Sequence, residues 1–314
     1  DTQMLKRLFP RFALADELAQ THKFFHWGLE FADVYLAQDG FDLMLGNPPW
    51  LKVEWNSGAV LGDVEPLLVL RKMSATKIRE MRDEIFAQYP ELRSTWLTEF
   101  EQGEGTQNFL NDVMNYPVLK GIQTNLYKCF LPQAWSNTHE LGVSGFLHPE
   151  GVYDDPKGGE LRKAIYPRLR AHFQFQNEMK LFPIGNRNKF STNIYGAYQE
   201  KLGFDNISNL FVPSTIDGCY QPADGKAVMG IKNDDDKWNV EGHPDRIIHV
   251  THDELELFAQ LYDEEGTEPL AARLPSLHAQ QLTEVLHKFA AQPQRLGDLQ
   301  DEYTSTVMFD EKIG

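Results

Sequence analysis

The chain has 314 residues, of which 41% are hydrophobic and 24% are charged, as is usual for a soluble globular protein. No apolar run reaches the roughly 20 residues that a membrane helix needs, so we expect no membrane partner. The two cysteines, Cys129 and Cys219, argue against a disulfide framework and favour a reducing, cytoplasmic compartment. The net charge is −16, and residues 201–314 carry 21 acidic against 9 basic residues. Any Lys and Arg that neutralise phosphates must therefore lie mostly outside this segment.

The first half of the chain predicts one strand followed by a large helical insertion. Residues 1–36 predict a helix and then an irregular aromatic stretch, and Phe41–Leu45 predicts a short buried strand that Asp39-Gly40 opens. Residues 51–120 predict helices throughout. In chain order these are a helix from Pro66 to Tyr89-Pro90, a second helix around residues 92–100 and a third around residues 109–114.

An α/β pattern follows the insertion. The predicted elements are a helix over residues 124–138, a strand over 142–151, a helix over 158–170 and two strands over 172–179 and 189–199. Residues 201–314 predict a mostly helical connector, with a strand near residues 209–216 and helices near 253–262 and 276–291. The fold class is therefore α/β, with residues 1–200 as one domain that includes the insertion.

The segment Asn47-Pro48-Pro49-Trp50 directly follows the first predicted strand. Ligands of open α/β sheets bind outside the carboxyl ends of the strands. The two prolines fix the turn and donate no hydrogen bond, so the Asn47 side-chain oxygen and the Pro48 carbonyl can face one point as acceptors. Two such acceptors suit an amino group, and Trp50 offers a flat surface for a planar ring. The loop therefore predicts a site for a heterocycle with an exocyclic amine.

The sequence "GNPPW" resembles the fourth motif of the N6-adenine DNA methyltransferases of bacterial restriction–modification systems, which use S-adenosylmethionine. Later segments follow in the order of the gamma-type enzymes, over about residues 22–200: "NLYKCF", "GVSGFLHPEG", "ELRKAIYPR" and "LFP…KFSTNIYGAYQ". The aromatic run "FFHWGLEFADVY" is similar to that of very large single-chain methylases of type II restriction or phage-defence systems. This resemblance implies a Rossmann-like sheet whose later strands end in an antiparallel hairpin.

The resemblance also implies roles for individual residues. Asn47 and Pro48, in the loop that Pro49 stiffens, would hold the target adenine amine of double-stranded DNA. Trp50 would stack on the extruded base, where most relatives have Tyr or Phe. The remaining substrate-binding residues that it implies are Phe182, Asn125 and Tyr127.

The cofactor half of such an enzyme is not visible in the sequence. The family binds S-adenosylmethionine on a Gly-rich strand–turn–helix before the Asn-Pro-Pro loop, and the 46 residues before Asn47 contain no such turn. Because the chain also begins with Asp1, we expect it to be the C-terminal part of a catalytic domain. The fragment itself should be inactive, with weak or no cofactor binding. Residues 201–314 would lead towards a DNA-recognition region.

Other interpretations remain open. The same loop occurs in methyltransferases that act on RNA or on protein glutamine, and the chain could also be a non-catalytic binding or scaffold module with a relic pocket. The group His243, His249, His252 and Asp253 has no usual metal-ligand spacing, so no metal site is expected.

Overall fold

The computed structural model describes residues 2–122, 125–223, 225, 227–233, 235–294 and 298. Six strands form one mixed sheet in the order β1-β2-β4-β3-β5-β6. Their bounds are β1 (Phe41–Gly46), β2 (Thr138–Pro149), β3 (Leu169–Gln176), β4 (Lys189–Tyr195), β5 (Phe204–Leu210) and β6 (Ile248–Val250). The pairs β1–β2 and β3–β5 are parallel, whereas β4 runs antiparallel to both β2 and β3, and β6 runs antiparallel to β5. The predicted α/β class and the antiparallel hairpin are confirmed.

This topology places four strand ends on one edge of the sheet. Because β1, β2, β3 and β5 point the same way, their carboxyl ends lie together, followed by Asn47, Glu150, Asn177 and Phe211. The antiparallel strand β4 begins at this edge. The predicted reactive loop therefore lies at the edge where such sheets bind ligands.

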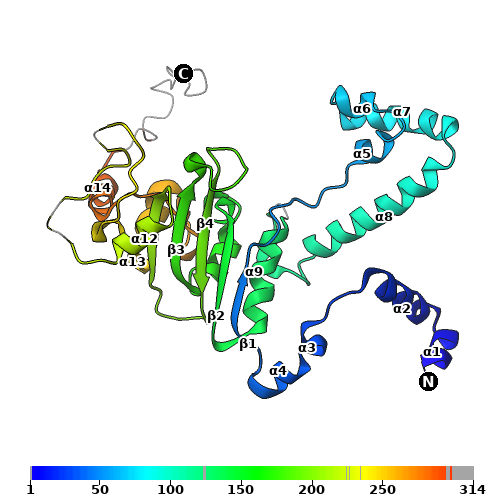
Figure 1. Cartoon of the computed structure of the whole chain (residues 1–314), viewed down its shortest axis with the longest axis horizontal. Coiled ribbons are helices and arrows are strands. Elements are labelled where there is room, and N and C mark those ends of the chain that lie inside the picture. Colours follow the sequence, from blue (N-terminus) through cyan, green and yellow to red (C-terminus); the bar gives the residue numbers. More distant parts are fainter. Residues whose placement is uncertain are drawn as a thin grey trace.

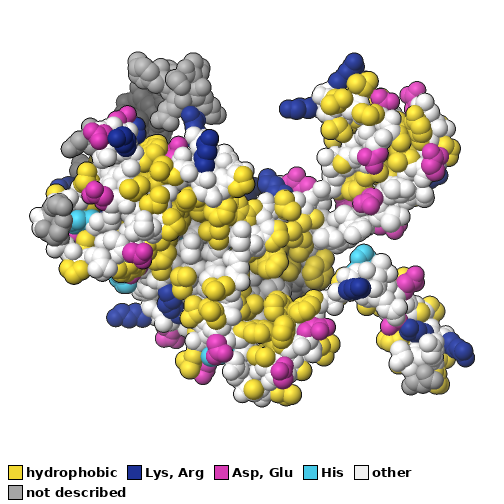
Figure 2. Space-filling model, viewed as in Figure 1, with side chains coloured by type: hydrophobic (Ala, Val, Ile, Leu, Met, Phe, Trp, Pro, Cys, Tyr) yellow, Lys and Arg dark blue, Asp and Glu magenta, His cyan; other side chains and the backbone are white. Residues whose placement is uncertain are grey.

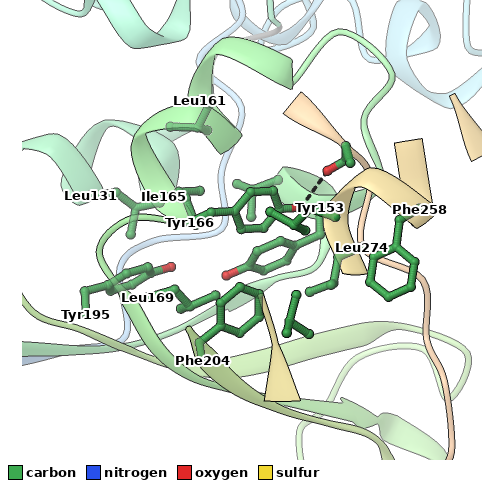
Figure 3. Packing of buried hydrophobic residues seen from close by; sticks show 14 of the residues in the cluster. Leu131, Tyr153, Leu161, Ile165, Tyr166, Leu169, Tyr195, Phe204, Phe258 and Leu274 are labelled. Carbon is green, nitrogen blue, oxygen red and sulfur yellow. Dashed lines mark hydrogen bonds between the residues drawn. The ribbon is translucent and has the colours of Figure 1, made fainter. Parts of the chain in front are cut away.

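Helices cover one face of the sheet and form the main core. They are α9 (Leu126–Asn137), α10 (Gly151–Asp154), α11 (Gly159–Ile165) and α13 (His252–Tyr262). Figure 3 shows Tyr153 and Tyr166 side by side among Leu161, Ile165, Leu169 and Phe204. The Tyr166 hydroxyl donates to the Ala272 carbonyl over 2.6 Å, which ties this core to the C-terminal region. A smaller apolar cluster on the opposite face contains Phe175, Phe190, Ile207, Leu210 and Cys219.

Helix α9 forms as predicted although Pro132 lies inside it, and α13 begins at a capping box. The Thr251 hydroxyl accepts from the Asp253 N–H, and the Glu254 carboxylate accepts from the Thr251 N–H. The other helices of the C-terminal region are α12 (Ser214–Cys219) and α14 (Gln280–Ala290), with short 3₁₀ turns η3 (Pro244–Arg246) and η4 (Pro269–Ala271). None of the described helices is long and apolar enough to cross a membrane.

Residues 51–111 form a helical lobe that stands away from the sheet (Figure 1). Its helices are α5 (Ser57–Leu61), α6 (Leu67–Leu70), α7 (Ala75–Gln88) and α8 (Leu92–Asn111). The predicted helix from Pro66 is in fact two helices, because the chain turns at Lys72, whose φ is +48°. The predicted third helix is also wrong, since Phe109 belongs to the last turn of α8, whereas Val113 and Met114 lie in a turn before η1 (Pro117–Leu119).

The N-terminal residues form α1 (Thr2–Leu8), α2 (Pro10–His22), α3 (Trp27–Glu30) and α4 (Ala32–Gln38), none of which contains a buried residue. Figure 1 shows α1 and α2 extending away from the sheet. Two further expectations differ from the structure. Strand β1 is exposed rather than buried, because Leu43 and Leu45 pack into none of the apolar clusters of the described residues. The described part of residues 201–314 is not mostly helical, since β5 and β6 extend the sheet and much of the remainder is irregular.

Candidate functional site

The segment Asn47–Trp50 continues from β1 without a regular element, so its conformation depends on the prolines and their neighbours. Pro48 is buried, Asn47 and Pro49 are exposed, and Trp50 is half-buried. A Cβ atom at Gly46 would lie 3.0 Å from the ring of Phe146, so glycine lets the end of β1 approach β2 closely. The loop is thus fixed at its apolar positions while the Asn47 amide stays accessible.

Trp50 packs on the side of the sheet that carries the smaller apolar cluster. Its ring lies 6.0 Å from those of Phe182 and Phe190, and these two phenylalanines meet edge to face at 5.0 Å. The buried Trp50 Nε1 has no hydrogen-bond partner in the described residues. The structure therefore brings together Trp50 and Phe182, which lie far apart in sequence.

Asn177 holds the turn that presents Phe182. It follows β3 at the start of η2 (Asn177–Met179) and is fully buried. Its side-chain oxygen accepts from the Phe182 N–H over 3.0 Å, and its amide donates to the carbonyls of Phe182 and Ile184 over 3.0 Å. The sequence analysis missed this residue, although an Asn at the end of a strand before "LFP" is a signal for such a turn.

A cavity of about 540 Å³ adjoins the loop on its other side. Asn47, Pro48 and Pro49 line it together with residues of β1 and α9, with Leu110 at the end of α8 and with Tyr116 after that helix. Trp50 and Phe182 do not line it. The cavity therefore reaches the Asn47 end of the loop, and the Trp50–Phe182 pair lies outside it at the other end of the loop. Figure 2 shows hydrophobic side chains gathered over α9 and β1.

The start of α9 lies against the loop. The Leu126 N–H donates to the Leu51 carbonyl over 2.9 Å, and Asn125 pairs with Lys52 in an antiparallel bridge. The Asn125 Oδ1 is buried and has no hydrogen-bond partner in the described residues. It is therefore an available acceptor beside Lys52, which follows Trp50 by two residues. Asn125 is therefore close to the predicted site.

Tyr127 lies deeper, with 2% of its surface exposed. Its ring stacks on His148 at 5.3 Å, and a Cβ at Gly151 would lie 3.3 Å from its hydroxyl. Burial and then the charge of Glu150 raise the pKa of the Tyr127 phenol, so it stays neutral. Tyr127 is a core residue beneath the end of β2, and it lines none of the cavity beside Asn47.

A buried polar cluster occupies the helix-covered face near the carboxyl ends of β2 and β3. The Glu150 carboxylate lies 3.1 Å from His172 Nε2 and accepts from the Gln174 amide over 2.8 Å. Burial opposes the charge of Glu150, but His172 and hydrogen bonds from Ser191 and Gln174 lower its pKa to about 2. Burial likewise opposes protonation of His172, but Glu150 outweighs it and raises the His172 pKa.

His148 beside this cluster stays neutral, because burial lowers its pKa to about 4. One ring nitrogen lies 2.9 Å from the Pro149 carbonyl and the other lies 2.9 Å from the Tyr195 hydroxyl. Neutral imidazole satisfies both contacts by donating to the carbonyl and accepting from the hydroxyl. Alternating polar residues in β3 were the sequence signal for this cluster, and the analysis did not use it.

The residues that line the cavity beside Asn47 do not form a suitable main binding site for S-adenosylmethionine. That molecule needs anchors for a ribose diol and an ammonium group, and a carboxylate usually binds the ribose. No Asp or Glu is among the described residues that line the cavity, and its polar members are few, with Asn47, Gln133 and Tyr116 the clearest. The residues that line this cavity therefore include the Asn47 amide but no acidic anchor for the ribose of such a donor.

A different part of the molecule brings three possible metal ligands together. One ligand atom each from His252, Asp253 and Glu256 lies within 4.8 Å of the others at the start of α13. All three side chains are exposed, and exposed acidic groups commonly lie this close without an ion. The sequence analysis did not anticipate the contribution of Glu256.

Neither a family model nor a curated protein matches the sequence. The solved structures that are similar to this chain include one from work on complex assembly and conformational transition of the type I R-M system. It matches with a TM-score of 0.34 and 13% sequence identity, over 80% of this chain and 42% of that chain. The chain thus spans less than half the length of this distant structural neighbour.

Proposed function

We propose that this chain is part of the catalytic domain of a DNA methyltransferase that modifies the N6 amine of an extruded adenine. The observation that carries the proposal is the position of Asn47–Trp50 at the carboxyl end of β1, with Phe182 brought to Trp50 from 132 positions further along the chain. The order β1-β2-β4-β3, with β4 antiparallel between β2 and β3, supports a Rossmann-like sheet with the antiparallel hairpin that the sequence resemblance implies.

The loop would act by binding and orienting the amine. The Asn47 side-chain oxygen and the Pro48 carbonyl would each accept one N–H bond, and the buried Pro48 keeps that carbonyl in place. With both N–H bonds held, the nitrogen lone pair points away from the ring plane towards an incoming methyl group. Positioning of this kind accounts for much of the acceleration in a group transfer.

S-adenosylmethionine would supply the methyl group. Because the described residues form no complete site for it, the donor must be bound mainly by residues other than these. The substrate would be double-stranded DNA. The target adenine would then have to leave the duplex before its amine could reach the loop. Trp50 and Phe182 would then stabilise the unpaired base by stacking.

The test replaces Asn47 by Ala in the natural protein. We expect methyl transfer to adenine in DNA to fall on the order of 10²-fold or more, as when one fixed hydrogen-bonding group is removed from an active site. Thermal stability should not change, because Asn47 is exposed. Asn108→Ala is the matched control, since Asn108 is an exposed residue of α8. A wild-type rate for Asn47→Ala would refute the role of Asn47.

The same assay separates the alternatives. DNA, RNA and a glutamine-containing protein are offered in turn as methyl acceptors, and transfer to DNA adenine is the expected result. Preferential transfer to RNA or to a glutamine amide would keep the role of the loop and change the substrate. Transfer to none of the three by the natural protein would favour a non-catalytic module.

A further inference from the structure

The helical lobe contains a second cavity, separate from the loop at Asn47. The lobe has its own apolar core of Leu61, Leu68, Ile78, Ile85, Leu92 and Trp96. A cavity of about 530 Å³ opens beside this core, between α5, the first half of α7 and α8. Its volume lies within the range of roughly 300–1,000 Å³ that is usual for small-ligand sites.

One wall of this cavity is aromatic. Trp55 meets the rings of Trp96 and Phe100 edge-on at 5.6 Å and 5.5 Å, and Trp96 stacks on Phe100 at 5.1 Å. Trp55 and Phe100 are half-buried, so part of each ring remains accessible. The Trp96 Nε1 donates to the Ser57 hydroxyl over 2.9 Å, which fixes the stack against α5.

Gly103 makes room for Trp55. A Cβ at position 103 would lie 3.1 Å from the Trp55 ring, closer than an ordinary contact. Glycine inside a helix costs about 1 kcal/mol relative to alanine. The lobe therefore keeps an unfavourable residue in α8 at the place where the indole lies against the helix.

The other wall is cationic. Arg79 and Arg82 line the cavity, and the Arg82 guanidinium lies 5.4 Å above the Trp96 ring. Its neighbour Asp83 approaches the Arg82 side chain to 3.4 Å. The Arg79 side chain has no ion pair or hydrogen bond in the described part of the chain, and the cavity is lined by one acidic residue, Glu104.

Positive charge continues beyond the cavity. Residues 71–82 contain five basic residues and one acidic residue, although the whole chain has a net charge of −16. Arg71, Lys72 and Lys77 are exposed and form no ion pair in the described residues. Figure 2 shows Lys and Arg side chains projecting from the part of the lobe near α6 and α7.

We propose that this cavity binds one nucleotide of a single nucleic-acid strand. The base would stack on the accessible rings of Trp55 and Phe100, and Arg79 and Arg82 would bind its phosphate. Glu104 could accept a hydrogen bond from a base amino group. A free phosphate would not use the aromatic wall, and an apolar peptide would not use the two guanidinium groups. Arg71, Lys72 and Lys77 would guide the neighbouring phosphates.

The test measures binding of a fluorescently labelled oligothymidylate to the full chain, without a methyl donor. The strand contains no adenine, so the result does not depend on the function proposed for Asn47. We expect binding to quench tryptophan emission. Trp55→Leu should weaken the affinity for the oligothymidylate about tenfold, as expected for the loss of one stacking contact with a base. Trp55→Phe, which keeps a ring, should retain most of the affinity.

The arginines are tested against a matched residue of the same lobe. The double variant Arg79→Gln and Arg82→Gln should weaken binding more than tenfold and reduce the slope of log affinity against log salt by about 0.7, the value for one phosphate of a single strand. Arg93→Gln should have little effect, because Arg93 is exposed at the start of α8 and does not line the cavity. Equal losses of affinity for this double variant and for Arg93→Gln would overturn the proposal. So would equal competition by inorganic phosphate or by polyglutamate.

Discussion

Strands β1 and β5 begin with the same two residues, Phe-Asp, and lie in opposite environments. Strand β1 reads "FDLMLG" and is apolar, yet Leu43 is 56% exposed and Leu45 is 72% exposed. Strand β5 reads "FDNISNL" and is largely polar, yet all of its residues except Asp205 are buried. Packing explains the difference, since β5 contributes to the apolar clusters on both faces of the sheet, with Phe204 in one and Ile207 in the other, whereas Leu43 and Leu45 belong to neither.

Burial of polar residues in β5 is possible because other strands satisfy them. The Asn206 side chain lies 2.7 Å from His172 of β3, and the Asn209 side chain accepts from Gln176 over 2.6 Å. A buried polar group costs little free energy once it is hydrogen-bonded and much when it is not. Residue polarity alone therefore misjudges burial in both strands, in opposite directions.

The largest expected effect comes from breaking the polar network beside β5. Replacing His172 by Leu leaves the charge of Glu150 buried without its partner, so we expect unfolding to become easier by about 3–5 kcal/mol. Chemical denaturation measures this difference. In the double variant Glu150→Leu and His172→Leu no charge remains, and most of the stability should return.

A surface ion pair provides the control for that prediction. Lys163 contacts Glu160 and Glu268 over 3.0 Å and 3.1 Å, and both carboxylates are largely exposed. Lys163→Leu should therefore change stability by no more than about 1 kcal/mol. A cost for His172→Leu no greater than that for Lys163→Leu would show that the buried pair contributes little.

A matched pair of substitutions tests the two strands directly. Ile207 of β5 is fully buried, so Ile207→Ala should cost about 2–5 kcal/mol. Leu45 of β1 loses a similar side chain in Leu45→Ala, but because it is exposed, the cost should stay within about 0.5 kcal/mol. The free energies of unfolding of the two variants decide the matter. Equal costs would mean that β1 is covered in solution.

Local patterns in the sequence predicted most of the elements near the site. The strand before Asn47, the helix over Pro132 and the β3–β4 hairpin follow from apolar runs and turn residues within short windows. The exposure of β1 did not follow, because a strand pattern does not state whether other elements cover the faces of the strand. Strand β5 was placed too late in the chain, since Asn206 and Ser208 interrupt the hydrophobic signal.

The arrangement of the candidate site was predictable where its residues lie in one motif and less so where residues distant in the sequence meet. The loop Asn47–Trp50 was found as a unit, and the sequence resemblance paired Phe182 with Trp50. The role of Asn177 in holding the turn before Phe182 depends on backbone groups that no sequence pattern specifies. The Glu150–His172 pair was missed because its members meet across neighbouring elements.

The third prediction uses pH to distinguish the buried face from the β1 edge, and its effect on stability per pH unit is smaller than that of Ile207→Ala. His148 has a pKa of about 4 in the folded protein, against 6.5 when it is exposed on unfolding. Between these values the unfolded chain binds the extra proton, so stability falls as pH falls, by at most about 1.4 kcal/mol per pH unit. Denaturant unfolding at a series of pH values measures this slope.

The variant His148→Asn isolates the contribution of that residue, and its slope should be smaller than that of the wild type. Burial also lowers the pKa of His278, so some slope of the same sign should remain. His172 does not change this slope between pH 4 and 6.5. Because its pKa is raised in the folded protein, the stability that it contributes is fully present below pH 6.5 and is lost only at higher pH. Glu150 loses its contribution only from about pH 4.5 downwards. Leu45→Ala should leave the slope of stability against pH unchanged, since β1 contributes no group to this cluster. An altered slope in that variant would show that the two ends of the sheet are coupled.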